Sequence, residues 1–451
     1  MRASVTRLEP RRGSFEQALV AFRAARFRAS VSELHGIESV AASTLRARAF
    51  LRLGDPEAAL RAVRQSAEAN RDRGELALLR AVAASRLGDV ELAAASFQHA
   101  RVYGISSANT ALEAEVEFYL ALDAFGRGDL DEARTLCQLS LEVGELPPLY
   151  GQSGGVVPLA HVISRTQELC GLIEAADGRY RNQLTHAQAA IATLDGCRIR
   201  DVFQQTVAVR NLAILARDFD LEEDALAIAA RADVLPWTDD VTRVKFITFE
   251  ALGWSSAIRG DIVDALRRFR TAASAASTTP EDILVSVNRA IVAREAGHRA
   301  LLVEEVERAL NIADYYNWET APDDYQLYLL PLAQVAAAIA PARARNLLTK
   351  HSTIRNAMPA TFAARNELRV RAEEAYSHGI VLRVEGREAA SIERLRFAFE
   401  TWDAIGYEWR AACAALELAE LRAGDVFRLA VARDLRRRPD SLFSARARQV
   451  A

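Results

Sequence analysis

The fold can be read from Leu87-Gly88-Asp89-Val90-Glu91-Leu92-Ala93-Ala94, because the pattern of this run returns along nearly the whole chain. An alanine lies seven residues before the glycine (Ala81), and another lies twelve residues after it (Ala100). Seven other turns have a small residue at both of these offsets. The eight turn residues are Gly54, Gly88, Gly128, Gly178, Asp220, Gly260, Gly297 and Gly386. Such a pattern indicates a helical repeat protein, whose function we expect to reside in a binding surface.

The offsets describe a pair of antiparallel helices. We expect each small residue to lie midway along one helix, where the two backbones approach closely and a large side chain would separate them. The first-helix positions are Ala47, Ala81, Ala121, Gly171, Ala213, Gly253, Ala290 and Gly379, and the second-helix positions are Ser66, Ala100, Ser140, Ala190, Ala232, Ala272, Ala309 and Ala398. The glycine ends the first helix in a left-handed conformation. The aspartates that we expect to cap the second helix are Asp55, Asp89, Asp129, Asp261 and Asp425.

Two of these turns carry a family resemblance. Residues 87–94 and 128–133 resemble the turn of a tetratricopeptide repeat, and Phe97 and Phe269 match the aromatic residue of its second helix. The resemblance covers roughly residues 15–437. It implies an all-α fold, a right-handed α-solenoid of about ten to eleven helical hairpins in which the first helices line a concave groove.

The repeats are longer and less even than the family standard. The step from Gly54 to Gly88 is the standard 34 residues, whereas the step from Gly88 to Gly128 is 40. Uneven repeats of this kind, together with residues 396–412, resemble the sensor region of MalT-like regulators of the LuxR class. Those regulators also carry an ATPase module and a helix-turn-helix domain. We expect both to be absent, because the chain has no Gly-Lys pair for a phosphate-binding loop and stops at Ala451.

Proline and glycine mark one clear break in the helical pattern. Residues 145–158 read Glu-Leu-Pro-Pro-Leu-Tyr-Gly-Gln-Ser-Gly-Gly-Val-Val-Pro, which no helix accommodates. The predicted organisation is an N-terminal tail (1–14), an N-terminal repeat block (15–144), a loop (145–158), a longer C-terminal array (159–437) and a solvated basic tail (438–451).

The composition excludes several classes of function. A net charge of −3 gives no attraction to nucleic acid or to an anionic membrane, so we expect neither as a direct partner. Four cysteines without close pairing, and the lack of an apolar leader or spanning segment, favour the cytoplasm. The seven histidines show no metal-ligand spacing, and no Gly-x-Ser-x-Gly motif is present. We therefore expect no enzyme, metal or cofactor, and we interpret the pair Cys170 and His186 as a coincidence of packing.

The candidate binding residues follow from the groove that the resemblance implies. Side chains two and three residues before the small packing residue of a first helix, and one and four after it, are expected to point into the groove. The candidates for binding a ligand or peptide are Arg165, Glu168, Arg210, Asn211, Arg217, Glu250, Trp254, Asn288, Arg294, Tyr376 and Arg383. Arginine and asparagine donors suit a carboxylate or a peptide backbone, and Trp254 adds a flat apolar contact. The alternative interpretation is a set of solvated polar helix faces.

Three functions remain open at this point. The first is a cytoplasmic sensor or adaptor that holds a peptide, a protein segment or a small effector in its groove, in signalling or transcriptional regulation. The second is a structural subunit that assembles into a homo-oligomer through its convex face or its ends. The third is the detached regulatory half of a LuxR-class regulator, which would reach DNA through another chain.

Overall fold

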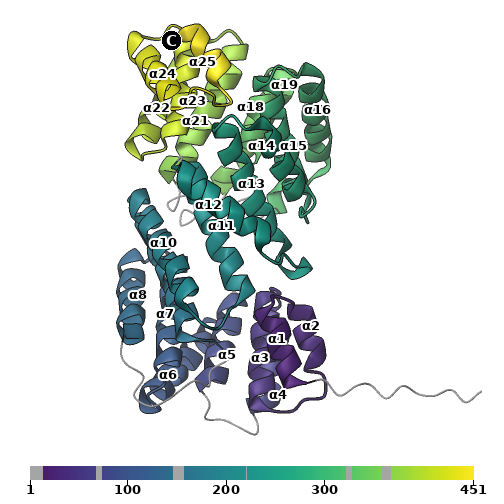
Figure 1. The fold of residues 1–451 in the computed structure, drawn as a ribbon, viewed down its shortest axis with the longest axis vertical. Coiled ribbons are helices and arrows are strands. Elements are labelled where there is room, and N and C mark those ends of the chain that lie inside the picture. The colour runs from purple at the N-terminus through teal and green to yellow at the C-terminus, as the bar shows by residue number, and fades with distance from the viewer. Residues whose placement is uncertain (1–13, 68–73, 146–156, 220, 321–327, 358–366) are drawn as a thin grey trace, which may run out of the picture. The chain divides into compact units, whose positions relative to one another are not determined.

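The structure is a computed structural model and describes residues 14–67, 74–145, 157–219, 221–320, 328–357 and 367–451 (Figure 1). These residues form helices joined by turns and contain no strand. The predicted all-α fold class is therefore confirmed. Among the described residues, no helix is both long enough and apolar enough to cross a membrane.

The first compact unit lies within residues 1–173, 186–205 and 236–241. Its helices are α1 (Phe15–Arg23), α2 (Phe27–Glu33), α3 (Val40–Arg52), α4 (Pro56–Ala67), α5 (Gly74–Arg86), α6 (Val90–Ser106), α7 (Thr110–Arg127), α8 (Leu130–Glu145), most of α9 (Leu159–Ala176) and parts of α10 (Tyr180–Gly196) and α11 (Val202–Asp218), with the short 3-10 helix η1 (Asp239–Val241). Apolar side chains of α3 to α7, among them Leu78 and Leu79, form one of its cores.

The second compact unit comprises residues 174–185, 206–235 and 242–451. It holds the remaining parts of α9 to α11, then α12 (Glu222–Val234), α13 (Thr242–Ile258), α14 (Ile262–Ala273), α15 (Thr279–Glu295), α16 (Arg299–Tyr315), η2 (Trp318–Thr320), α18 (Leu329–Ala337), α19 (Pro341–Ala357), α21 (Glu367–Val384), α22 (Glu388–Ala404), α23 (Glu408–Glu420), α24 (Asp425–Arg437) and α25 (Ser444–Val450). The predicted loop 145–158 lies mostly outside the described residues, so the predicted domain bounds stay a prediction.

Consecutive helices pack against each other as hairpins in both units. The packed pairs are α1 with α2, α3 with α4, α5 with α6, α7 with α8, α13 with α14, α15 with α16, α18 with α19, α21 with α22 and α23 with α24. All seven predicted turn glycines have a positive φ, between 74° and 85°. The eighth turn residue, Asp220, lies outside the described residues.

The small residues do lie where the two helices of a hairpin meet. Every first-helix and second-helix position named above is buried. Gly253 shows why size matters: a Cβ at this position would lie 2.6 Å from the ring of Phe269 on the partner helix. At Gly253 even the methyl group of alanine would force the ring of Phe269 to move.

Four of the five predicted aspartate caps are present. Asp55, Asp89, Asp129 and Asp261 each accept a hydrogen bond from the backbone N–H three residues later, at 2.8–3.1 Å. The prediction for Asp425 is wrong, because Gly424 takes the capping position of α24 with φ 147° and Asp425 becomes the first helical residue. An acidic residue there still favours the helix dipole.

Early and late first helices of the second unit meet. Trp254 on α13 stacks on Trp409 on α23, with ring centroids 5.8 Å apart. Arg369 on α21 donates to Asp218 on α11 at 2.7 Å, although 151 residues separate them in sequence. The array of the second unit therefore curls until its ends face each other.

The basic C-terminal segment is folded, which corrects the expected solvated tail. Helix α25 packs on α23 and α24, and Leu442 and Ala447 are buried. The guanidinium of Arg446 is bound by carboxylates of α15 and α23. The sequence suggested an exposed tail because the segment is rich in arginine, although its few apolar residues, such as Leu442 and Ala447, are buried.

Two cysteines of the first unit lie in contact although they are far apart in sequence. The thiols of Cys137 on α8 and Cys170 on α9 share a hydrogen bond, which together with burial raises the pKa of Cys137. Both are free thiols. Their separation of almost one repeat in sequence concealed the contact, because it is the packing of successive hairpins that brings them together.

Candidate functional site

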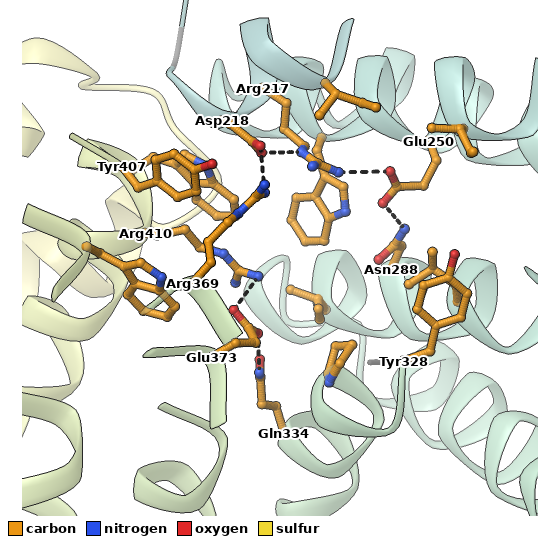
Figure 2. Close-up of a pocket in the computed structure, with 18 of the residues that line it drawn as sticks. Arg217, Asp218, Glu250, Asn288, Tyr328, Gln334, Arg369, Glu373, Tyr407 and Arg410 are labelled. Carbon is orange, nitrogen blue, oxygen red and sulfur yellow. Dashed lines mark hydrogen bonds and ion pairs between the residues drawn. The ribbon is translucent and has the colours of Figure 1, made fainter. Parts of the chain in front are cut away.

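The candidate site is a pocket in the second unit, with a cavity of about 370 Å³ (Figure 2). Its lining comes from first helices of successive hairpins: α11, α13, α15, α18, α21 and α23, with one residue of the second helix α22. This agrees with the expected role of the first helices. The volume lies within the range of roughly 300–1,000 Å³ that is usual for ligand pockets.

A chain of hydrogen-bonded charges runs along one side of the pocket (Figure 2). Asp218 accepts from Arg369 at 2.7 Å and from Arg217 at 2.8 Å. Arg217 also donates to Glu250 at 3.1 Å, and Glu250 accepts from the amide of Asn288 at 2.9 Å. Charged groups on three first helices are thus oriented before any ligand enters.

A shorter chain lies on the opposite side. Glu373 on α21 accepts from Gln334 on α18 at 2.8 Å and from Arg410 on α23 at 2.9 Å (Figure 2). The guanidinium of Arg410 lies over the ring of Trp409, 4.9 Å from its centroid. A carboxylate and an aromatic face therefore hold Arg410 in place. Because its side chain is 29% exposed, a ligand can still reach it.

Burial shapes the ionisation of this pocket. Burial alone would raise the pKa of Asp218, but the guanidiniums of Arg217 and Arg369 outweigh it and lower that pKa. Burial also raises the pKa of the Tyr407 hydroxyl, which therefore stays protonated at neutral pH. Asp218 is therefore held ionised by its two guanidinium partners.

The aromatic residues supply the apolar part of the lining. Trp254, Trp402, Trp409, Tyr407 and Phe246 border the cavity. The indole N–H of Trp409 is buried and has no hydrogen-bond partner among the described residues. Since a buried donor without a partner is costly, a ligand acceptor that reached it would be stabilised.

Four of the predicted binding residues line this pocket: Arg217, Glu250, Trp254 and Asn288. Arg210 and Asn211 do not. They lie on α11 outside the lining, and the Arg210 guanidinium donates to the Asn211 side chain at 2.7 Å. A single helix presents successive turns to different surroundings, which a fixed offset from the small residue does not capture.

Three other predicted residues lie in a second polar cluster of the same unit. Arg294 contacts Glu295 at 2.7 Å, and Arg383 contacts Glu420 at 2.7 Å and also Glu417. Tyr376 is buried, with its ring 5.3 Å from that of Trp402, and burial raises its pKa. These residues are brought together with one another, but outside the pocket lining.

The remaining two predicted residues lie on α9 in the first unit. Arg165 is buried and donates to Glu115 at 2.9 Å, within a cluster that also holds Arg48. Glu168 lies one turn further along α9. Neither residue is part of the pocket lining, and Arg165 has a partner in the core of the first unit.

The sequence reasoning missed several residues that line the pocket. They are Asp218, Gln334, Arg369, Glu373, Tyr407, Trp409 and Arg410. Glu373 lies one turn before the predicted Tyr376, so it was within reach of the same helical face. The signal in the sequence is the clustering of charge and aromatic residues in the first turns of residues 367–384 and 408–420.

Among the described residues, no group of three His, Cys, Asp or Glu side chains is placed to hold a metal ion. Cys170 and His186, interpreted above as a coincidence of packing, each make another contact. His186 shares a hydrogen bond of 2.8 Å with Gln167, and the thiol of Cys170 contacts Cys137.

The hairpins and the pocket together define an all-α helical repeat protein with a pocket lined mainly by the first helices of its hairpins. No protein-family model and no curated protein matches the sequence.

Solved structures to which the chain is similar include the APC/C hetero-tetramer Cut9-Hcn1, at 12% identity over 96% of this chain and 95% of that chain, with a TM-score of 0.30. The TPR domain of P58(IPK) is 14% identical over 90% and 97%, with a TM-score of 0.28. A monomeric mutant of IFIT1 with Gppp-AAAA is 12% identical over 85% and 79%, with a TM-score of 0.36.

Proposed function

We propose that this chain is a non-catalytic tetratricopeptide-type scaffold that captures a peptide, a protein segment or a small effector in the pocket of its second unit. The observation that carries the proposal is the convergence of first helices from successive hairpins on one cavity. Binding sites of bundles and repeat arrays are built in this way, from side chains on facing helices.

The chemistry of the lining supports a ligand with both apolar and polar parts. Stacked indoles give it a flat apolar surface, and arginines with carboxylate partners give it charge-assisted donors. A ligand carboxylate or peptide carbonyl can take over one donor of a guanidinium that keeps its other bonds. Such a ligand gains orientation from groups that are already held in place, which lowers the entropy lost on binding.

The biological setting belongs to the same proposal. The resemblance of residues 396–412 to the terminal repeat of MalT-like regulators favours signalling or transcriptional regulation, with the chain acting in the cytoplasm. In this setting the captured molecule would be an effector or a segment of a regulatory protein. A homo-oligomer is compatible with the same pocket.

The test compares two matched arginines. Arg410 is 29% exposed, pairs with Glu373 and lines the pocket, whereas Arg289 is 27% exposed, pairs with Glu305 at 2.8 Å and lies outside the lining. Each chain is purified from its native host, and the bound peptides and small molecules are released and identified by mass spectrometry. We expect Arg410→Gln to reduce the bound ligand at least about tenfold, since a charged hydrogen bond contributes roughly 1.5–3 kcal/mol.

Arg289→Gln is the control and should retain the ligand, with both variants matching the wild-type circular dichroism. Equal recovery of the ligand from the wild type and Arg410→Gln would exclude the pocket as its site. Loss from both variants would point to a general effect of removing an ion pair.

A further inference from the structure

A second binding arrangement lies in the same unit, where the C-terminal segment, residues 439–451, packs among helices far from it in sequence. Arg446 on α25 is the centre of this contact. Its Nε and one Nη donate to the two carboxylate oxygens of Glu420, both at 2.9 Å. The same guanidinium donates to Glu417 at 2.8 Å and to Glu295 at 3.2 Å.

The three carboxylates form a built site, which we call the guanidinium site. The side chains of Glu295 and Glu417 are 1% and 5% exposed, and that of Glu420 is 17% exposed. They come from α15 and α23, so the site exists only when those two first helices are brought together. A fork-shaped cation with five N–H donors fits such a set better than a compact ammonium group does.

Charge balance shows that the site requires a third positive charge. Arg294 and Arg383 neutralise part of the three carboxylates, and Arg446 supplies the third positive charge. Without Arg446, a buried carboxylate would lose its compensating charge, which is strongly unfavourable. The oxygens of the three carboxylates can accept more hydrogen bonds than Arg294 and Arg383 donate to them.

The rest of the segment contacts the array as a docked peptide would. The backbone N–H of Leu442 donates to the carbonyl of Ala257 on α13 at 3.1 Å, and Leu442 and Ala447 are buried. The backbone of Asp440 lies so close to Gly260 that a Cβ there would collide with it. Ala447 and Phe443 also border a small cavity of about 20 Å³ with Trp409, the residue whose ring lines the ligand pocket.

We infer that the guanidinium site is a recognition site for an arginine-bearing helical peptide segment, and that residues 439–451 are its internal occupant. The inference rests on the proposed function and deepens it, because it names the class of partner. A partner segment with an arginine at the matching position would bind by displacing the chain's own segment.

The experiment uses the full-length chain and a fluorescent synthetic peptide with the sequence of residues 439–451. Arg446→Ala empties the guanidinium site while leaving the segment attached. We expect this variant to bind the peptide at least about tenfold more tightly than the wild type does, measured by fluorescence anisotropy, because the wild-type site is filled. A peptide that carries glutamine in place of Arg446 should bind neither chain.

Arg448→Ala is the matched control, since Arg448 lies on the same helix, is 57% exposed and is not bound by the three carboxylates. It should behave as the wild type does. Should Arg446→Ala fail to fold, Arg446→Lys is used instead, and we expect it to bind the peptide more tightly than the wild type because an ammonium cannot make the forked contact.

Equal binding of the peptide to wild type, Arg446→Ala and Arg448→Ala, or equal binding of the glutamine peptide, would overturn the inference. The inference would also be overturned if neither Arg446→Ala nor Arg446→Lys bound the peptide. The result is separate from the pocket test, because Arg410→Gln leaves the guanidinium site intact. Loss of ligand in Arg410→Gln without peptide binding by Arg446→Ala would refute this inference alone.

Discussion

A buried group of ion pairs makes the stability of the first unit depend on pH. In the first unit, Glu115 accepts from both Nη atoms of Arg48, at 2.7 and 2.8 Å, and from Arg165 at 2.9 Å. Burial would raise the pKa of Glu115, but the two guanidiniums outweigh it and lower that pKa to about 2. Its ordinary value is near 4.5. Glu115 therefore stays ionised in the folded chain between about pH 4.5 and about pH 2, where an ordinary glutamate is protonated.

The stability of the first unit should fall in acid because of this residue. Between pH 4.5 and 2 the unfolded chain binds a proton at Glu115 and the folded chain does not, so lowering the pH favours unfolding. The stabilisation is fully present above pH 4.5 and is lost as pH falls towards 2. We expect Glu115→Gln to lower the free energy of unfolding at pH 7 by about 3 kcal/mol, since it leaves two buried guanidiniums without their carboxylate.

Urea unfolding of both chains at several pH values is the measurement. The difference in free energy between wild type and Glu115→Gln should shrink as the pH falls from 4.5 to 2. A difference that stays constant over this window would show that Glu115 is protonated at its ordinary pKa and that the guanidiniums do not hold it ionised.

Helices and their turns are the scale at which the sequence was most informative. The turn glycine, the small packing residues and the aspartate cap all interact within one hairpin, so their spacing reports local structure directly. Asp261 illustrates this, since it accepts from the backbone N–H of Asp264 at 2.9 Å and begins α14. The prediction for Asp425 was wrong because its neighbour Gly424 takes the capping position, which depends on the φ angle of that glycine.

The same difference gives a prediction for the two aspartates. Asp261→Ala removes a capping hydrogen bond and should lower the free energy of unfolding by about 1 kcal/mol. Asp425→Ala removes a side chain that is 93% exposed and makes no capping bond, so its effect should be smaller, about 0.3 kcal/mol from the helix dipole and the exposed ion pair with Arg428. Thermal unfolding followed by circular dichroism compares them, and equal effects would refute the assignment of the caps.

The sequence could not predict which turn of each first helix borders the pocket. That depends on how tightly the second unit curls, and the curl is set by contacts such as Trp254 with Trp409 and Arg369 with Asp218. The early first helices contribute Arg217, Glu250 and Asn288 near the expected positions, whereas α21 and α23 contribute their first turns. The packing of the C-terminal segment was missed for the same reason, because its partners lie far away in the chain.

Each unit, taken as a whole, is an array of hairpins, and the pocket of the second unit lies between its early and late first helices. Such an array grows by stacking, so its ligand site belongs to no single repeat. The binding of a ligand should therefore depend on several first helices at once, and second helices should contribute little. This distinction between first and second helices is the central claim.

Two tyrosines allow the claim to be tested directly. Tyr328 lines the pocket at the start of α18, whereas Tyr315 lies on the second helix α16 and is 93% exposed. Either is replaced by the photo-reactive analogue p-benzoylphenylalanine in the full-length chain, which is then irradiated in its native host. Mass spectrometry identifies the cross-linked molecules. We predict one dominant adduct from position 328 that is absent from position 315, and an adduct found only at position 315, or equally at both, would contradict the account.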